Sequence, residues 1–290
     1  MKKISTNLNL KKISTDLKRR GIQLLSAFLT NPFIQNFRSG NIYKGPLKYI
    51  CVPGLNCYSC PSAAGSCPIG AMQTVAGSNR FHISLYVLGF LMIIGSVFGR
   101  VICGFLCLFG FLQDLLYKIP APKLHVPARL DHKLRYLKYL ILLFLVILLP
   151  AFFIDEFGLG EPFFCKYICP AGTIEAGIPL LIANRSLRQM AGNLFLWKLL
   201  TAGILILASI FIYRPFCRYF CPLGAFYSFF NKISIIHLNL DKNTCVHCHK
   251  CETVCPMNVN ILKNINTAEC IRCGKCKNSC PTGSIQWNKN

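Results

Sequence analysis

The sequence is short of charge, and of negative charge most of all. Only 14% of its 290 residues are charged, and ten acidic side chains stand against 32 Lys and Arg, for a formal net charge of +22. With 53% hydrophobic residues and a mean hydropathy of +0.45, the chain is too apolar for an ordinary soluble domain, which indicates membrane helices. No paired carboxylates and no nucleophile–base set stand out, so the sequence marks no stand-alone catalytic site.

The surplus of positive charge does not indicate a nucleic-acid-binding protein, although a soluble domain of this charge would. The Lys and Arg side chains gather beside apolar segments, where the anionic headgroups of a cytoplasmic leaflet attract them. We therefore expect membrane lipid, and no nucleic acid, as the partner of these cations.

Four apolar stretches are predicted to span the membrane, at residues 21–37, 81–99, 136–154 and 194–213. The last three are each long enough to cross the ~30 Å hydrocarbon layer as a helix. The first is short and broken by Asn31 and Pro32, so it is interpreted as a spanning or partly re-entrant helix. No small-residue cleavage pattern follows it, which argues against a signal peptide. The chain then divides into a basic cytoplasmic head at 1–20, a transmembrane domain at 21–235 and a C-terminal domain at 236–290.

The expected orientation follows from Lys and Arg near the spans. Seven lie in the head and more follow the second and fourth spans, whereas the loop after the third span carries Asp155, Glu156 and Glu161. Both termini are therefore predicted to be cytoplasmic, in a multi-pass protein of the cell (inner) membrane.

Cysteine is abundant, and eight of the 18 cysteines fall in two runs near the C-terminus. Each run has the spacing C-x2-C-x2-C-x3-C-P, which holds a [4Fe–4S] cluster, and the fourth Cys of each run ligates the other cluster. The spacing assigns one cluster to Cys245, Cys248, Cys251 and Cys280, and a second to Cys270, Cys273, Cys276 and Cys255. A pair of structural zinc sites is the alternative, but the doubled C-P endings have no role in a zinc site.

These runs and their flanks resemble the bacterial two-cluster ferredoxin domain. The segments I-I-H-L-N-L-D before the first run and S-I-Q-W after the second are similar to its two short strands. His247 and His249 lie between ligands, but a His-ligated cluster needs a different pattern. Both are therefore expected at the surface or behind the ligands.

Residues 100–119 and 214–233 form an internal repeat, in which R-V-I-C-G-F-L-C-L-F-G aligns without a gap with R-P-F-C-R-Y-F-C-P-L-G. Each copy follows a predicted span and continues as an amphipathic segment suited to the membrane surface. The repeat implies two halves related by a pseudo-two-fold axis along the membrane normal. One cluster at the inner membrane face is therefore predicted on Cys103, Cys107, Cys217 and Cys221; free buried cysteines are the alternative.

A looser pair of motifs precedes the second and fourth spans, C-Y-S-C-P-S-A-A-G-S-C-P-I-G at 57–70 and C-K-Y-I-C-P-A-G at 165–172. At the outer face, Cys165 and Cys169 are expected to meet two or more of Cys51, Cys57, Cys60 and Cys67. Spacing alone does not fix the choice. Cys60 and Cys67 are our assignment for an outer cluster, and a Cys51–Cys57 disulfide is an alternative outside the cytoplasm.

The predicted fold is mostly α and integral to the membrane: a four-helix transmembrane bundle of two pseudo-symmetric halves, plus a small α+β ferredoxin-like 2[4Fe–4S] domain. The C-x3-C-P motifs, the spans and the ferredoxin runs together resemble the NapH/MauN-type membrane iron–sulfur proteins, to which NosR-type and CcoG-type proteins are related. The resemblance covers about residues 40–290, and the family's cysteine pairs map onto Cys103/Cys107, Cys165/Cys169 and Cys217/Cys221. It implies electron transfer at the membrane, often between a quinone pool and a partner redox protein, with one or two iron–sulfur clusters in the membrane domain.

The predicted function is an electron relay between a quinone or an external redox partner and cytoplasmic [4Fe–4S] clusters, as in a quinol dehydrogenase-type electron-transfer subunit. The alternative is an accessory protein that reduces a metal or flavin cofactor of another enzyme during maturation, or that senses redox state. Arg80, His82, Gln113 and Asp114 are candidate quinone contacts, although such residues are common at membrane interfaces. The basic C-terminal domain favours an acidic ferredoxin or flavodoxin as partner, and attraction to the leaflet explains its charge equally well.

Overall fold

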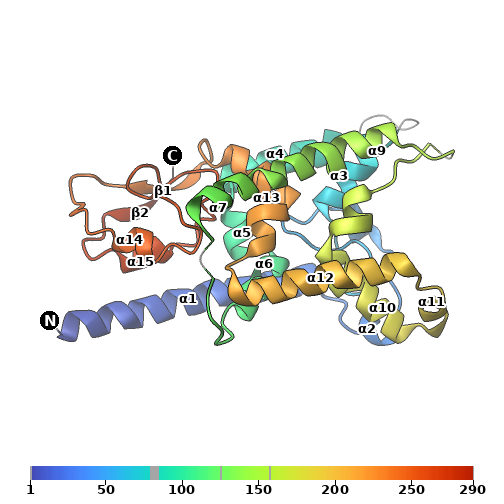
Figure 1. The fold of residues 1–290 in the computed structure, drawn as a ribbon, viewed down its shortest axis with the longest axis horizontal. Coiled ribbons are helices and arrows are strands. Elements are labelled where there is room, and N and C mark those ends of the chain that lie inside the picture. Colours follow the sequence, from blue (N-terminus) through green and yellow to red (C-terminus); the bar gives the residue numbers. More distant parts are fainter. Residues whose placement is uncertain (1, 79–84, 125, 157, 290) are drawn as a thin grey trace.

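The computed structural model describes residues 2–78, 85–124, 126–156 and 158–289. The structure is elongated and mostly helical, with a small cysteine-rich domain at one end (Figure 1). The mostly helical class predicted from the sequence is thereby confirmed. The one sheet among the described residues has two strands and belongs to the small domain.

Two helices are long and apolar enough to cross a membrane. One joins α7 (Ala128–Arg135), α8 (Leu137–Leu140), the π-helical η2 (Ile141–Leu148) and α9 (Leu149–Phe152) into a continuous helix, and the other is α12 (Asn193–Phe211). Only 28% and 11% of their most apolar windows are buried, so both leave apolar side chains exposed along most of their length.

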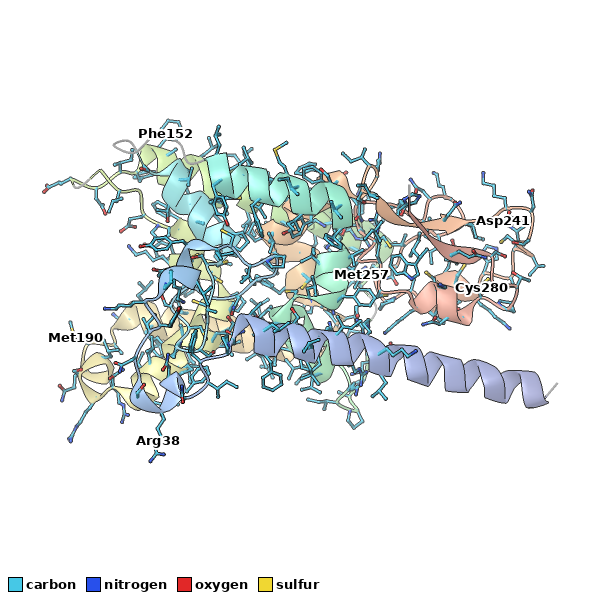
Figure 2. All side chains as sticks on the ribbon, turned by 180° about the vertical axis from the view of Figure 1, so that it is seen from behind. Arg38, Phe152, Met190, Asp241, Met257 and Cys280 are labelled. Carbon is cyan, nitrogen blue, oxygen red and sulfur yellow. The ribbon has the colours of Figure 1, made fainter. Side chains whose placement is uncertain are left out.

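The two long helices run along the long axis of the molecule in opposite directions. The amide of Leu124 donates to the carbonyl of Phe211 at 3.0 Å, so the segment that leads into the first helix lies beside the end of the second. Phe152 and Met190, at their other ends, lie far from Asp241 and Cys280 of the small domain (Figure 2).

The other two predicted spans differ from the expectation. The helix α4 (Leu85–Phe98) is apolar but has 14 residues, and positions 81–84 of that predicted span lie outside the described residues. The helix α1 (Lys2–Thr30) passes without a break through the predicted border at residue 20. It ends before Asn31, because the following proline disfavours a helical conformation there. One helix thus joins the predicted head to the first apolar stretch, whose borders stay a prediction, and a four-helix bundle is not confirmed.

Short helices fill the space between the long ones and carry the cysteine motifs (Figure 1). The two copies of the repeat supply α5 (Val101–Phe105), α6 (Leu108–Leu116), the π-helical η5 (Phe216–Phe220) and α13 (Pro222–Phe230). The looser motif pair supplies α3 (Pro68–Ala76), the π-helical η3 (Phe164–Ile168) and η4 (Gly172–Gly177), and α10 (Ile178–Ala183). Three further short helices are α2 (Asn36–Ser39), the 3₁₀ helix η1 (Pro46–Tyr49) and α11 (Arg185–Gln189).

The irregular segment 51–67 is mostly buried, which is unusual for a loop. Leu55, Cys60 and Ala63 are at most 2% exposed. Irregular backbone at such depth is tolerated where protein surrounds it and satisfies its polar groups. This burial brings the cysteines of the first motif into the interior rather than to a surface.

The small domain is built on the antiparallel strands β1 (Ile236–Leu240) and β2 (Ile285–Lys289), which place Leu238 opposite Trp287. Both strands were predicted from the flanks of the cysteine runs and are confirmed. The short helices α14 (Lys250–Thr253) and α15 (Lys275–Ser279) follow the two cysteine loops.

Buried charges fix the small domain against the helices. The ammonium of Lys138 lies 2.7 Å from both carboxylate oxygens of Glu269, and Arg100 approaches the same carboxylate at 3.3 Å. Arg272, which is fully buried, donates to the Ser234 hydroxyl at 2.5 Å. Arg100 and Arg214 are among the cations that follow the second and fourth predicted spans, but both are fully buried in the protein.

Candidate metal centres

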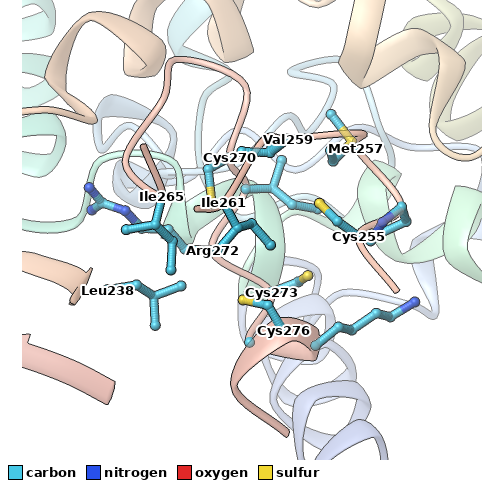
Figure 3. A pocket seen from close by; sticks show the side chains of 14 residues that line it. Leu238, Cys255, Met257, Val259, Ile261, Ile265, Cys270, Arg272, Cys273 and Cys276 are labelled. Atoms are coloured by element: carbon cyan, nitrogen blue, oxygen red, sulfur yellow. The ribbon is translucent and has the colours of Figure 1, made fainter. Parts of the chain in front are cut away.

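The eight cysteines of the small domain gather in two groups of four. One cavity is lined by Cys245, Cys248, Cys251 and Cys280, and another by Cys255, Cys270, Cys273 and Cys276. Figure 3 shows the second group, which Cys255 joins from the other cysteine run. The structure brings together the quartets that were assigned from spacing, and their ligation of clusters stays a prediction.

The tight loops between these cysteines depend on left-handed backbone at matching positions. His247 (φ 49°) and His249 (φ 55°) have this conformation in the first loop, and Arg272 (φ 51°) and Gly274 (φ 75°) have it in the second. A non-glycine residue adopts it at a cost of ~1–2 kcal/mol. Both histidine side chains are exposed, and His249 also lines the cavity of the first group.

The repeat brings together Cys103, Cys107, Cys217 and Cys221, here called the inner quartet. All four are buried, and Cys221 lies within electrostatic reach of the other three. Cys107 and Cys221 each precede a helix, and each sulfur accepts a hydrogen bond from a glycine amide three residues on, at 3.4 and 3.3 Å. The two copies therefore present their sulfurs in the same way.

Each copy of the repeat contributes one arginine that donates a hydrogen bond to the other copy. Arg100 donates to the carbonyl of Cys217 at 3.3 Å, and Arg214 donates to the carbonyl of Cys103 at 2.5 Å. Asp114 binds Arg214, and also Arg19 of α1 at 2.9 Å. Burial alone would raise the pKa of Asp114, but Arg214 and Arg19 together hold it below the ordinary carboxyl range.

A second membrane-domain group, here called the outer quartet, consists of Cys57, Cys67, Cys165 and Cys169. These cysteines line one cavity of about 310 Å³. The carboxylate of Glu175 accepts a hydrogen bond from the amide of Cys57 at 2.7 Å, which holds the loop against η4. Asn56 and Lys198 also line this cavity.

Cys60, which our assignment placed in this group, does not line the cavity. Its thiol lies 3.2 Å from the Ser62 hydroxyl and 3.9 Å from the Asn31 side-chain oxygen. The loop turns between residues 57 and 60, where the Cys60 amide bonds the Cys57 carbonyl, so the two side chains diverge. The cavity is therefore lined by Cys57 and not by Cys60, and which cysteines ligate a cluster stays a prediction. Cys51 and Cys57 are both free thiols and form no disulfide.

Sequence reasoning missed a pair of glutamines that bind one sulfur in each membrane-domain quartet. Gln73 donates to Cys165 and Gln113 donates to Cys217, each at 3.1 Å. The detectable signal was C-x2-G-x2-Q, which occurs at 67–73 and again at 107–113. The partner segments also match, as F-C-K-Y-I-C-P-A-G and F-C-R-Y-F-C-P-L-G.

Burial keeps thiols of the membrane-domain quartets neutral unless a cation lies nearby. Burial raises the pKa of Cys107 and of Cys165 to about 12, so neither ionises readily without a nearby cation. Iron in a cluster supplies that positive charge and takes thiolate ligands. In the outer cavity the side chain of Asn56, only 2% exposed, has no hydrogen-bond partner for either polar atom. A cluster sulfur is a suitable acceptor for its amide.

Across the described residues, no three Cys, His, Asp or Glu side chains converge closely enough on one metal ion. The number and place of the clusters stay a prediction.

Two glycines allow neighbouring quartets to approach closely. A Cβ on Gly104 would lie 2.5 Å from the Ile271 carbonyl and 3.8 Å from the Cα of Cys273. A Cβ on Gly54 would lie 3.1 Å from the Cα of Cys107. Only glycine fits at such contacts.

The inner and outer quartets are neighbours rather than residents of opposite membrane faces. Gly54 touches Cys107, and three residues of chain from Gly54 to Cys57 span at most ~11 Å. Their separation is therefore roughly half of the ~30 Å hydrocarbon layer or less. The buried course of the loop is the physical reason for this departure from the expected placement.

The candidate quinone contacts are occupied or outside the described residues. Arg80 and His82 lie outside them. Gln113 is bonded to Cys217, and Asp114 is bonded to Arg214 and Arg19. Neither of the two described candidates is available to a quinone.

Two families of iron–sulfur domains match the chain. The 4Fe-4S binding domain matches residues 81–127, 139–183 and 194–241, and the 4Fe-4S dicluster domain matches residues 237–281. The first covers both copies of the repeat, and the second covers both cysteine runs of the small domain. No solved structure matches the chain.

Several curated proteins are similar to this chain. The uncharacterized protein MJ0750 of Methanocaldococcus jannaschii is 32% identical over 61% of this chain and 66% of its own length. The putative electron transport protein YccM of Escherichia coli is 28% identical over 60% of this chain and 46% of its own length. The regulatory protein NosR of Pseudomonas aeruginosa is 31% identical over 44% of this chain and 16% of its own length. The matches thus span less than two thirds of each relative.

Proposed function

Because this chain is an iron–sulfur electron-transfer protein related to YccM and NosR, we propose that it relays electrons through four [4Fe–4S] clusters, between a quinone or an external redox partner at the outer quartet and its small domain. The observation that carries the proposal is the series of four cysteine quartets with close backbone contacts between neighbours. Gly54 touches the inner quartet from the loop that supplies the outer one, and Gly104 touches the small domain beside Cys273. Each cluster, when bound, takes up and releases single electrons.

Four ligand sets follow from this proposal. The small-domain sets are those assigned from spacing, the inner set is the repeat quartet, and the outer set contains Cys57 in place of Cys60. The protein excludes water from the inner set, because Cys103, Cys107, Cys217 and Cys221 are each at most 6% exposed. Low polarity and hydrogen bonds to sulfur are the means by which a protein sets cluster potentials.

The exposed apolar surface supports a place in the membrane. Leu196, Leu200, Ile204 and Leu207 of α12 are each more than half exposed, as are Leu85 and Ile93 of α4. A soluble protein rarely exposes so large a contiguous apolar patch. With Lys and Arg concentrated near the small domain, both termini lie on the cytoplasmic side in this proposal.

The redox partners enter at the two ends of the series. At the outer quartet, the cavity of about 310 Å³ is near the lower size of ligand sites, and Lys198 lies on its wall, where a quinone or an external redox protein would approach. At the small domain, Val246 and Cys248 are exposed beside Lys242 and Lys250. The carboxylate of Glu269 points away from this face and pairs with Lys138 of the helical part. This face therefore suits an acidic ferredoxin or flavodoxin.

Iron and acid-labile sulfide per chain, with EPR of the reduced protein, test the proposal directly. Four clusters require about 16 iron atoms per chain, four for each cluster. Anaerobically purified, fully loaded protein that holds only about 8 iron atoms, enough for two clusters, would leave a tethered ferredoxin and end the relay. Reduction of the clusters by quinol in vesicles then tests the quinone partner, and its absence would favour an external redox protein.

A redox-sensing role is the second candidate, because the relative NosR carries the name of a regulatory protein. A sensor needs clusters that respond to redox state but no sustained electron flow. Steady-state turnover between a quinol and a soluble acceptor separates the two roles. Reduction of the clusters without turnover would support the sensor.

A further inference from the structure

The side chains of Gln73 and Gln113 are held in one conformation at equivalent places. Gln73 follows Cys67 by six residues on α3, and Gln113 follows Cys107 by six residues on α6. Each side chain is at most 1% exposed. Each reaches across to a partner segment about a hundred residues away in the chain, η3 in one case and η5 in the other.

The orientation of each amide is fixed by what it bonds. The oxygen of Gln73 accepts from the backbone amide of Phe164 at 2.9 Å, and the oxygen of Gln113 accepts from that of Phe216 at 3.2 Å. A backbone N–H can only donate, so the oxygen must face it and the NH₂ group must face the sulfur. The same NH₂ group also donates to a carbonyl four residues back, at 3.2 and 3.4 Å. Both N–H donors of each amide are therefore engaged, and each oxygen accepts one hydrogen bond.

A donor aimed at a cysteine sulfur has a definite electronic effect. A hydrogen bond to the charged form of a group stabilises that form. For a thiolate bound to a cluster, hydrogen bonds to sulfur are one of the determinants of the reduction potential. The extra negative charge of the reduced cluster is stabilised by the donor, so each glutamine raises the potential of its own site.

We propose that Gln73 and Gln113 are matched positioning residues that set the reduction potentials of the outer and inner clusters, each acting on one cysteine sulfur. This inference rests on the proposed presence of clusters in both membrane-domain quartets. It goes beyond ligation, because neither glutamine is a ligand. It also explains why an amide, and not an apolar side chain, stands at the same place in both copies.

The test uses Gln73→Met and Gln113→Met in the full-length, cluster-loaded protein. Methionine keeps the length of the side chain and lacks the donor. The midpoint potential of each cluster is followed by EPR-monitored redox titration. We expect Gln113→Met to lower the inner midpoint and Gln73→Met the outer one, each by about a tenfold change in the electron-uptake equilibrium, which is ~59 mV for a one-electron couple.

A matched control separates this effect from loss of any buried amide. Gln23 of α1 is 0% exposed but donates to the backbone carbonyl of Gly104 at 3.1 Å and not to a sulfur. Gln23→Met should leave both midpoints in place. Gln113→Glu is the second variant, because it keeps the oxygen at Phe216 and replaces the donor with a second oxygen, which should lower the inner midpoint further.

The possible results separate the role proposed for the glutamines from the four-cluster proposal on which it rests. Unchanged midpoints in both Met variants, with all clusters loaded, would overturn the inference and leave the four-cluster proposal standing. Equal shifts at both sites, or the same shift in Gln23→Met, would also overturn it, because the effect would then be general. Loss of the inner signal alone in Gln113→Met supports a site-specific role, whereas loss of both signals counts against it. Only two clusters in the wild-type protein would refute the proposed function instead.

Discussion

The inner and outer quartets receive the same hydrogen bonds from the same motifs, yet they differ in what surrounds them. At the inner quartet, Arg100 and Arg214 are fully buried and donate to cysteine carbonyls. At the outer quartet, Pro162 stands where Arg214 stands in the repeat, and a cavity of about 310 Å³ adjoins the cysteines. One motif therefore builds a packed, positively charged site beside the small domain and an open site at the far end.

This difference between the two sites predicts which of them holds an electron more tightly. Positive charge buried near a cluster stabilises the added electron, and burial strengthens the interaction because the local dielectric constant is low. The inner site is therefore expected to hold an electron more tightly than the outer one. Electrons entering at the open site would then move toward the small domain.

The largest effect is expected from a pair of cysteine substitutions. Cys57→Ser should abolish the outer cluster, a loss of one in four, because this side chain lines the outer cavity. Cys60→Ser should leave all clusters in place, because its thiol faces Ser62 and Asn31. Iron content and EPR signals check both variants. Loss of the cluster in Cys60→Ser alone would restore our assignment from the sequence.

Cys57 and Cys60 also show which cysteine quartets could be predicted from the sequence and which could not. The small-domain quartets follow from loop spacing because their cysteines are held by tight local turns. The inner quartet follows from the repeat because its two copies are identical in length between the cysteines. The cysteines of the outer quartet could not be chosen from the sequence, because Cys57, Cys60 and Cys67 lie in a long irregular segment. The path of this segment depends on tertiary contacts, such as the hydrogen bond between Glu175 and Cys57.

Other features were missed for the same reason, because they depend on contacts between distant parts of the chain. The two strands were predicted because their sequences resemble those that flank the cysteine runs of a two-cluster ferredoxin, whereas the continuous α1 was missed. Arg19 lies in the segment that was predicted to be a polar head. Its guanidinium instead forms a buried ion pair with the Asp114 carboxylate at 2.9 Å. Gln113 looked like an interface residue because a single amide in an apolar segment gives no periodic signal, and only the matching Gln73 reveals it.

A second prediction concerns the charges. Arg214→Met should lower the free energy of unfolding by ~3 kcal/mol, because it removes one partner of a buried ion pair and leaves Asp114 with Arg19 alone. It should also lower the inner midpoint potential. Lys198→Met, at the outer cavity, should have little effect on stability, because this side chain is only partly buried. Unfolding in detergent, followed by loss of cluster absorbance, measures the difference, and equal losses would remove the contrast between the sites.

A third prediction tests the joint between the inner quartet and the small domain. Gly104→Ala places a Cβ 2.5 Å from the Ile271 carbonyl, so the two parts must move apart, at a cost of ~1–3 kcal/mol. Electron transfer from the inner site to the small domain should slow, as followed by rapid-mixing spectroscopy. Gly89→Ala is the control, since nothing lies within 4 Å of its added Cβ. Wild-type rates in Gly104→Ala would show that this contact is not on the electron path.

The smallest expected difference compares equivalent glycines in the two sites. A Cβ on Gly110 would lie 3.1 Å from the Arg214 guanidinium and 3.2 Å from the Cys103 carbonyl. At Gly70 the one contact within 4 Å is the Cβ of Cys67, at 3.9 Å. Gly110→Ala should therefore cost ~1 kcal/mol through overpacking, whereas Gly70→Ala should gain a few tenths to ~1 kcal/mol from helix propensity. Thermal unfolding of the two variants gives the sign of each change. A loss at Gly70 as large as that at Gly110 would mean that the outer site is as tightly packed as the inner one, and that its open cavity closes in solution.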